Sequence, residues 1–426
     1  MRTLLIALLL CLAFPGVARA ERALTLDQAL ALARDANRDL TAARERLVQA
    51  DADVSSAWAR LLPSLSAQGR WLHNDVEVSF PLSGQNLTIQ PLNQLTGTVN
   101  ASIPLLVPAA IPAVASVKHA REAVAATLEA TTGDILLSVA QACYAAAGTD
   151  ELVAARREGT ALTEQTLRDA KARLSAGAAG PVDVTRAELS VTQAQQAVTE
   201  AEDSRARAYR GLATLLLLRE PFVVAPGSSE VSAPGTTEAL VAAALDRRPE
   251  LRAAREAALA RDSQLSAIDW QWAPSLSAFA NATTNNAAGL TGRQSSWSAG
   301  LQLDWSLFDG GVRLADRRRS ASQQRDADLQ VLKTRDAISD EVADRVGAVQ
   351  TRRSALATAL RGEGLAKEAL EVVRTQYAAG TAAQVELLQA QDALIGARVQ
   401  LAQARFDAAI SDLSLRRSAG DYPAAR

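Results

Sequence analysis

The clearest pattern in the chain is an alternation of apolar and polar residues in the segment SWSAGLQLDWS. One face of this segment carries Trp297, Ala299, Leu301, Leu303 and Trp305, and the other carries Ser298, Gly300, Gln302, Asp304 and Ser306. A period of two residues indicates a β-strand. Weaker alternation follows each of two prolines, so we expect four strands, at about 64–73, 96–105, 275–284 and 296–306.

These strands have the length and pattern of a membrane wall. Roughly ten residues are enough to cross a bilayer in a tilted strand, and the six tryptophans lie in or near these segments. From the alternation alone, a soluble antiparallel sheet with one face on a core is the preferred interpretation. In lipid, however, four strands would leave unpaired edges and could not close, so chains would have to share a barrel. Gln302 and Asp304 are candidates for its lumen.

Long helices are expected after each pair of strands. Proline is absent from 113–180 and from 275–422, and alanine and leucine are abundant there. In the second stretch, apolar residues are spaced by threes, fours and a seven, as in a coiled coil: Ile338, Val342, Val346, Val349, Leu356 and Leu360. Gly148 and Gly159 weaken the expectation that the first long helix is continuous.

The chain contains two copies of one unit. The word PSLSA occurs at 63–67 and again at 274–278, and DLTAARE and ELRAARE match in the same register. Further along, LSAGAAGPVDVTRAE (174–188) matches YAAGTAAQVELLQAQ (377–391). These two segments are 203 residues apart, whereas the two PSLSA words are 211 residues apart. In each copy a proline would end a helix and begin a strand. We therefore expect a signal peptide at 1–20, a first repeat at 21–218, a linker at 219–236, a second repeat at 237–418 and a tail at 419–426.

The N-terminus and the composition restrict location and chemistry. The start MRTLLIALLLCLAFPGVARA has a basic residue, an apolar stretch and an A-x-A pattern, which together predict a secretory signal. After it, no stretch of about 18 apolar residues predicts a transmembrane helix. The net charge is -2, and the two histidines, His73 and His119, are far apart. We therefore expect no nucleic-acid binding, no metal site, no cofactor and no enzyme activity.

Several sequence motifs, taken together and in their order along the chain, resemble those of the TolC-like outer-membrane efflux protein family, also called outer membrane factors. The resemblance covers nearly all of the mature chain and is carried by LTLDQALALARDANRDL, LPSLS, APSLS, LDWSLFDGG and QYAAGTAAQVELLQAQDAL. It implies a mainly α fold with a small antiparallel β part, built from two tandem helix–strand–strand–long helix–helix repeats. Three chains would form a 12-stranded outer-membrane β-barrel continuous with a periplasmic α-helical coiled-coil barrel.

The resemblance also implies a function and partners. The homotrimer would be a channel-tunnel in the outer membrane of a Gram-negative bacterium, embedded in outer membrane lipid and extending into the periplasm. It would serve as the exit duct of a tripartite efflux or type I secretion system. A periplasmic adaptor, or membrane fusion protein, would join it to an inner-membrane pump of the RND, ABC or MFS type. The competing hypothesis is a soluble periplasmic coiled-coil protein with a structural or adaptor role.

The resemblance places a gate at the periplasmic tip. The turns that contain Gly177 and Gly380 would form this tip and are candidates for adaptor docking. Tyr377 matches a tyrosine that helps to hold the tip closed in the family. The family's partner arginine is replaced here by Ala382, which puts that latch in doubt.

Acidic side chains just beyond the turns are the remaining gate candidates. Glu386 matches the first of two acidic positions that line the opening in the family, and Gln389 occupies the second. Asp183 is the counterpart of Glu386 in the first repeat. The simpler interpretation is that both acids are solvated and favoured by the dipole of the helix that they begin.

Overall fold

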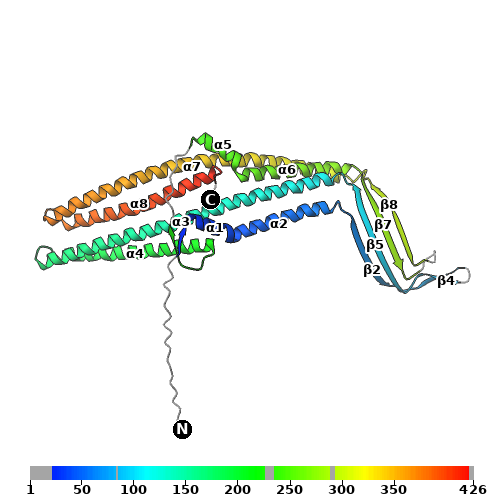
Figure 1. Ribbon diagram of the computed structural model, residues 1–426, viewed down its shortest axis with the longest axis horizontal. Helices are drawn as coiled ribbons and strands as arrows, with labels where there is room; N and C mark the ends of the chain where they lie inside the picture. Colours follow the sequence, from blue (N-terminus) through cyan, green and yellow to red (C-terminus); the bar gives the residue numbers. More distant parts are fainter. Residues whose placement is uncertain (1–21, 83–84, 226–234, 288–292, 422–426) are drawn as a thin grey trace, which may run out of the picture.

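The computed structural model shows a long helical body with a β-sheet at one end (Figure 1). It describes residues 22–82, 85–225, 235–287 and 293–421, so the expected signal peptide at 1–20 lies outside the described residues. The helices are α1 (Leu26–Ala36), α2 (Arg38–Ala59), α3 (Ala110–Ser175), α4 (Pro181–Leu216), α5 (Thr237–Arg247), α6 (Pro249–Asp269), the 3-10 helix η1 (Trp270–Trp272), α7 (Val312–Ala378) and α8 (Gln384–Ser418). The strands are β1 (Arg22–Thr25), β2 (Ser64–His73), β3 (Val78–Leu82), β4 (Gln85–Gln90), β5 (Asn93–Leu106), β6 (Phe222–Ala225), β7 (Ser275–Asn285) and β8 (Ser295–Asp304).

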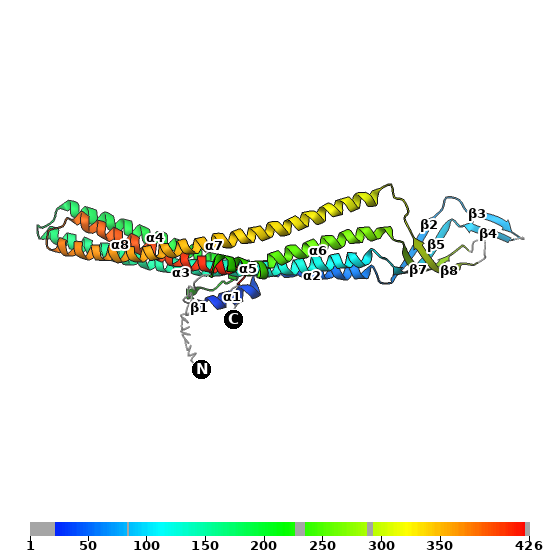
Figure 2. The ribbon, with the colours of Figure 1, turned by 90° about the horizontal axis from the view of Figure 1, so that it is seen from above.

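The two halves of the chain repeat one order of elements. In each half, a short helix and a medium helix lead to strands, and a long helix and a returning helix follow. The long helices α3 and α7 have 66 and 67 residues, which corresponds to about 100 Å each. The hairpins α3–α4 and α7–α8 lie side by side at the end opposite the sheet (Figures 1 and 2). The expected mainly α fold with two repeated halves and a small antiparallel sheet is confirmed.

Helix α3 is continuous through both glycines that were expected to weaken it. A Cβ atom at Gly148 would lie 2.8 Å from the ring of Phe406, and one at Gly159 would lie 2.9 Å from Ile395. Both positions therefore let side chains of α8 sit against the backbone of α3. The glycines serve close helix packing rather than a break.

The apolar composition of α3 has a related explanation. Among the described residues, α3 alone is long and apolar enough for a membrane span by length and composition, although no such stretch was expected from the sequence. Its helical neighbours along its length are α1, α2, α4, α6 and α8. Alanine allows these helices to approach, so packing against protein accounts for the apolar stretch.

The main sheet has four antiparallel strands in the order β2-β5-β7-β8. Strands β5 and β7, from different repeats, form its centre, so the duplicated units share one sheet. Phe279, which interrupts the polar face of β7, pairs with Gly300 on β8. A Cβ atom at Gly300 would lie 3.2 Å from the Phe279 ring, so the glycine makes room for the ring.

Two smaller sheets were not expected from the sequence. Strand β1 pairs in parallel with β6, which lies inside the segment 219–236 that was expected to be a linker. Strands β3 and β4 form a hairpin that extends past the far end of the main sheet (Figure 1). Strands of four to six residues are too short to show a clear period, which explains why the pattern missed them.

Candidate functional site

The four-stranded sheet separates polar from apolar side chains across all its strands. One row of paired residues on the apolar face consists of Leu65, Ala101, Ala280 and Ala299. The next row, on the opposite face, consists of Ser66, Asn100, Asn281 and Ser298. Within this polar row, the Ser298 hydroxyl donates to the Asn281 side-chain oxygen at 2.6 Å. The register therefore aligns the alternation of each strand into a two-faced wall.

The apolar face of this wall is uncovered in the single chain. Leu65 is 76 % exposed and Trp297 is 80 % exposed. A soluble antiparallel sheet would bury such a face against a core. The exposed face instead has the character of a surface that lies against lipid.

Tryptophans and cations gather where the strands meet the helices. The Trp305 indole donates to the Trp272 carbonyl at 3.1 Å, and the Arg313 guanidinium lies 4.1 Å from the centre of the Trp272 ring. Lys118 lies 5.1 Å from the ring of Trp58. Aromatic rings flanked by cations are typical of a membrane–water boundary.

The two lumen candidates lie next to each other on β8. Gln302 and Asp304 share the polar face, and the Gln302 amide donates to both Asp304 carboxylate oxygens, at 3.0 and 3.1 Å. Ser277 and Ser275 stand opposite them on β7. These four side chains are hydrophilic, and a lumen would arise only when other chains complete the wall.

The two hairpin turns have one backbone conformation. Gly177 has φ +71° and Gly380 has φ +77°, and both occupy the position after the last helical residues of a long helix. In the first turn, the Ala178 N–H donates to the Arg173 carbonyl at 2.8 Å; in the second, the Thr381 N–H donates to the Gln376 carbonyl at 2.9 Å. Glycine is required because other residues adopt this left-handed conformation only at a cost.

Tyr377 is held by an arginine from the other hairpin. The Arg173 guanidinium, on α3, lies 4.0 Å from the centre of the Tyr377 ring, on α7, and donates to the Tyr377 carbonyl at 3.0 Å. In the family, the arginine that contacts this tyrosine comes from the position that Ala382 occupies here. In this chain, Arg173 contacts Tyr377 from α3 instead. Sequence reasoning missed Arg173, because a basic residue in the last turn of a helix is common and the contact crosses two hairpins.

The acidic candidates lie in different surroundings. The Asp183 carboxylate accepts from the Gly180 N–H at 3.0 Å, so it caps the helix that it begins. The Asp183 carbonyl accepts from the Gln384 amide at 2.8 Å, which is a second link between the hairpins near the tip. Glu386 is exposed in the first turn of α8, and its carboxylate has no hydrogen bond or ion pair within the described part of the chain. Gln389 is also exposed, one turn further along α8.

Comparisons with known proteins agree with this architecture. The family model described as "Outer membrane efflux protein" matches residues 29–216 and 240–421, one match in each half. The chain is 24 % identical to outer membrane efflux protein BepC of Brucella suis over 274 residues, which is 63 % of this chain and 59 % of that relative. It is 26 % identical to outer membrane protein TolC of Vibrio cholerae over 309 residues, which is 68 % of each chain. A crystal structure of a Pseudomonas aeruginosa membrane protein superposes with a TM-score of 0.80 at 22 % identity, covering 93 % of both chains, and this likeness concerns the fold.

Proposed function

The chain belongs to the outer membrane efflux protein family, and we propose that three copies of it assemble into the exit duct of a tripartite efflux system. It is an outer-membrane efflux channel that extends into the periplasm, and the family consists of transport proteins rather than enzymes. Membership also sets aside the competing hypothesis of a soluble periplasmic adaptor.

The observation that carries the proposal is the open four-stranded sheet with an exposed apolar face. Strands β2 and β8 are its edges, and in lipid each unpaired backbone group at an edge costs several kcal/mol. Two chains would supply eight strands, and a barrel of that size is filled by its own side chains. Three chains would supply twelve strands and leave room for a passage. The polar row through Asn100 and Asn281, together with Gln302 and Asp304, would then line the lumen.

The helical hairpins supply the periplasmic part of the duct. Substrate would enter at the tip formed by the Gly177 and Gly380 turns and leave through the barrel. A periplasmic adaptor would dock at these turns and connect the duct to an inner-membrane pump, which would supply the energy. The Arg173–Tyr377 contact would hold α7 against α3 in the closed tip, and opening would shift one hairpin relative to the other.

The exposed Glu386 side chains would set the ion preference of the narrow end. Three copies of this carboxylate around a narrow opening would attract cations and repel anions. The test is the reversal potential in planar bilayers for the unmodified protein, Glu386→Ala and the control Glu45→Ala, whose acid lies on α2 far from the tip. We expect cation preference to fall in Glu386→Ala alone.

The possible failures of this test are distinguishable. If the unmodified protein conducts but Glu386→Ala keeps the same cation preference, then the proposed ring of three Glu386 carboxylates is wrong. The proposal that the protein is a channel is not affected by this result. If the unmodified protein, purified from outer membranes, passes no current at all, then the duct itself is contradicted.

A further inference from the structure

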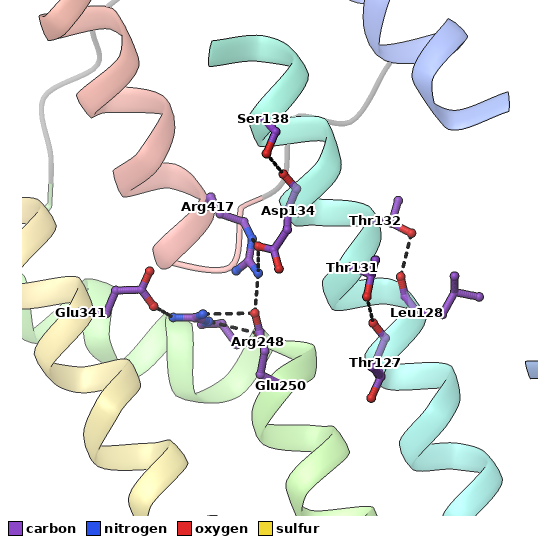
Figure 3. Close-up of polar contacts among 10 residues, drawn as sticks. All are labelled: Thr127, Leu128, Thr131, Thr132, Asp134, Ser138, Arg248, Glu250, Glu341 and Arg417. Atoms are coloured by element: carbon purple, nitrogen blue, oxygen red, sulfur yellow. Dashed lines mark hydrogen bonds and ion pairs between the residues drawn. The ribbon is translucent and has the colours of Figure 1, made fainter. Parts of the chain in front are cut away.

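Five charged side chains join four helices near the middle of the molecule (Figure 3). We call this group the ionic clamp; it consists of Asp134 on α3, Arg248 at the junction of α5 and α6, Glu250 on α6, Glu341 on α7 and Arg417 on α8. The clamp lies where the returning helix α8 ends and α6 begins (Figures 1 and 3). It therefore connects the second hairpin to the body of the molecule.

The clamp is a linear chain of alternating charges. Arg417 donates to Asp134 Oδ1 at 2.7 and 3.1 Å and also to Glu250. Arg248 donates to Glu250 at 3.1 and 3.2 Å and to Glu341 on its other side. Arg417 and Arg248 are only 5 % and 7 % exposed at their side chains. Buried charges of this kind require their partners, so the geometry is strongly fixed.

The surroundings of the clamp reinforce this geometry. Burial would raise the pKa of Glu250, but hydrogen bonds from Arg248 and Arg417 outweigh it and lower the pKa to about 2. The carboxylate is therefore charged at neutral pH. Gly420, just after α8, has φ +81°, and a Cβ atom there would lie 2.9 Å from the Cβ of Arg247. The end of α8 is thus packed directly on the junction of α5 and α6.

The first repeat builds the same junction without a buried arginine, and Asp39, the counterpart of Glu250, is exposed there. The offset that relates Pro63 to Pro274 places Asn37 opposite Arg248. Asn37 caps α2 and donates through its amide to the Leu215 carbonyl at 3.3 Å, at the end of α4. Near that end, Leu212 and Leu216 are buried in an apolar cluster. The ionic clamp is therefore not required to close a junction of this shape.

We propose that the ionic clamp is a positioning device that sets the angle at which the hairpin α7–α8 leaves the body, and with it the resting width of the tip. This inference rests on the proposed channel function. Helix α8 has 35 residues, which corresponds to roughly 50 Å between the clamp and the tip. A tilt of about 5° at the clamp would shift the far end by roughly 4 Å over that length. Charged hydrogen bonds suit this role because they fix direction as well as distance.

The test compares single-channel recordings of the unmodified protein, Arg417→Gln and Glu341→Gln in planar bilayers at neutral pH. Glu341 lies at the outer end of the clamp and is 39 % exposed at its side chain, so its replacement is the milder change. The matched control is Arg352→Gln, which removes an exposed ion pair with Asp407 between the same two helices, α7 and α8. The conservative variant Arg417→Lys keeps one positive charge at the buried position.

We expect the open probability to rise at least about threefold in Arg417→Gln and by less in Glu341→Gln. Arg352→Gln should leave it unchanged, and Arg417→Lys should restore most of the closed time. If Arg417→Gln does not assemble as an SDS-resistant oligomer, then Glu341→Gln decides the question.

Two results would overturn the clamp as a positioning device. One is an unchanged open probability in the clamp variants that assemble, even if their melting temperature falls, because that would show a merely structural role. The other is an equal rise in the Arg352→Gln control. A lack of current in the unmodified protein would instead contradict the channel proposal itself.

Discussion

The ends of the returning helices α4 and α8 occupy equivalent places in the two repeats, and both pack on apolar residues, but only the end of α8 also has buried ion pairs. At the end of α4, Leu212 and Leu216 join a cluster of buried apolar residues that includes Leu24 and Phe222. At the end of α8, the buried side chains include polar and charged ones: Asp412, Ser414, Arg417 and Ser418. Apolar burial has no preferred direction and tolerates salt, whereas buried ion pairs are directional and titrate. The two junctions should therefore respond differently to the same treatment.

The largest effect is expected at the apolar junction. Leu212 is fully buried, so Leu212→Ala leaves a cavity and should destabilise each chain by about 3 kcal/mol. The melting temperature of the purified protein in detergent should fall by the same amount at low and at high salt. A small or strongly salt-dependent fall would show that this junction is not held by packing.

At the ionic junction, Glu250→Gln should cost somewhat less. The substitution leaves Arg248 and Arg417 without a shared carboxylate, but Glu250 is 26 % exposed, so water can partly replace it; we expect about 2 kcal/mol per chain. The loss should be visible as a lower melting temperature in the same measurement. An unchanged melting temperature would show that the network contributes nothing to stability.

Low pH should weaken the ionic junction but not the apolar one. Glu250 has a lowered pKa, so its stabilising contribution is present above the ordinary glutamate pKa of about 4.5 and is lost as the pH falls toward about 2. The melting temperature of the unmodified protein should therefore fall more steeply between pH 5 and pH 3 than that of Glu250→Gln. Parallel curves would contradict the assignment of this titration to the clamp.

The smallest effect is expected for the neutral counterpart of Arg248. Asn37→Ala removes the cap of α2 and the bond to the Leu215 carbonyl, which should cost about 1 kcal/mol per chain. Because no charge is lost, the change should not depend on salt. Asn37→Asp, which keeps the cap acceptor, is the control and should recover most of the loss.

The sequence predicted those features that a local pattern encodes. The alternation in 296–306 identified β8, because a strand with two different faces must place every second residue on the same side. The doubled PSLSA word identified the two halves, because each proline stands at the same boundary between helix and strand. Gly177 and Gly380 marked the hairpin turns, because the backbone there requires a positive φ.

The features that were missed depend on contacts between distant segments. Nothing near Arg173 indicates that it reaches Tyr377, and nothing near Arg417 indicates Glu250, because the partners lie 204 and 167 residues apart in the chain. Gly148 suggested a break in α3 when its actual role is to admit Phe406 of α8. Such pairs become visible only when the fold has brought the helices together.

The proposed duct depends on the open sheet being completed by other chains, and native mass spectrometry of the protein released from outer membranes in mild detergent tests this most directly. We predict a single species with the mass of three chains, because three copies of the four strands close a wall with space for a passage. A particle of one chain that stays dispersed in buffer without detergent would contradict the account.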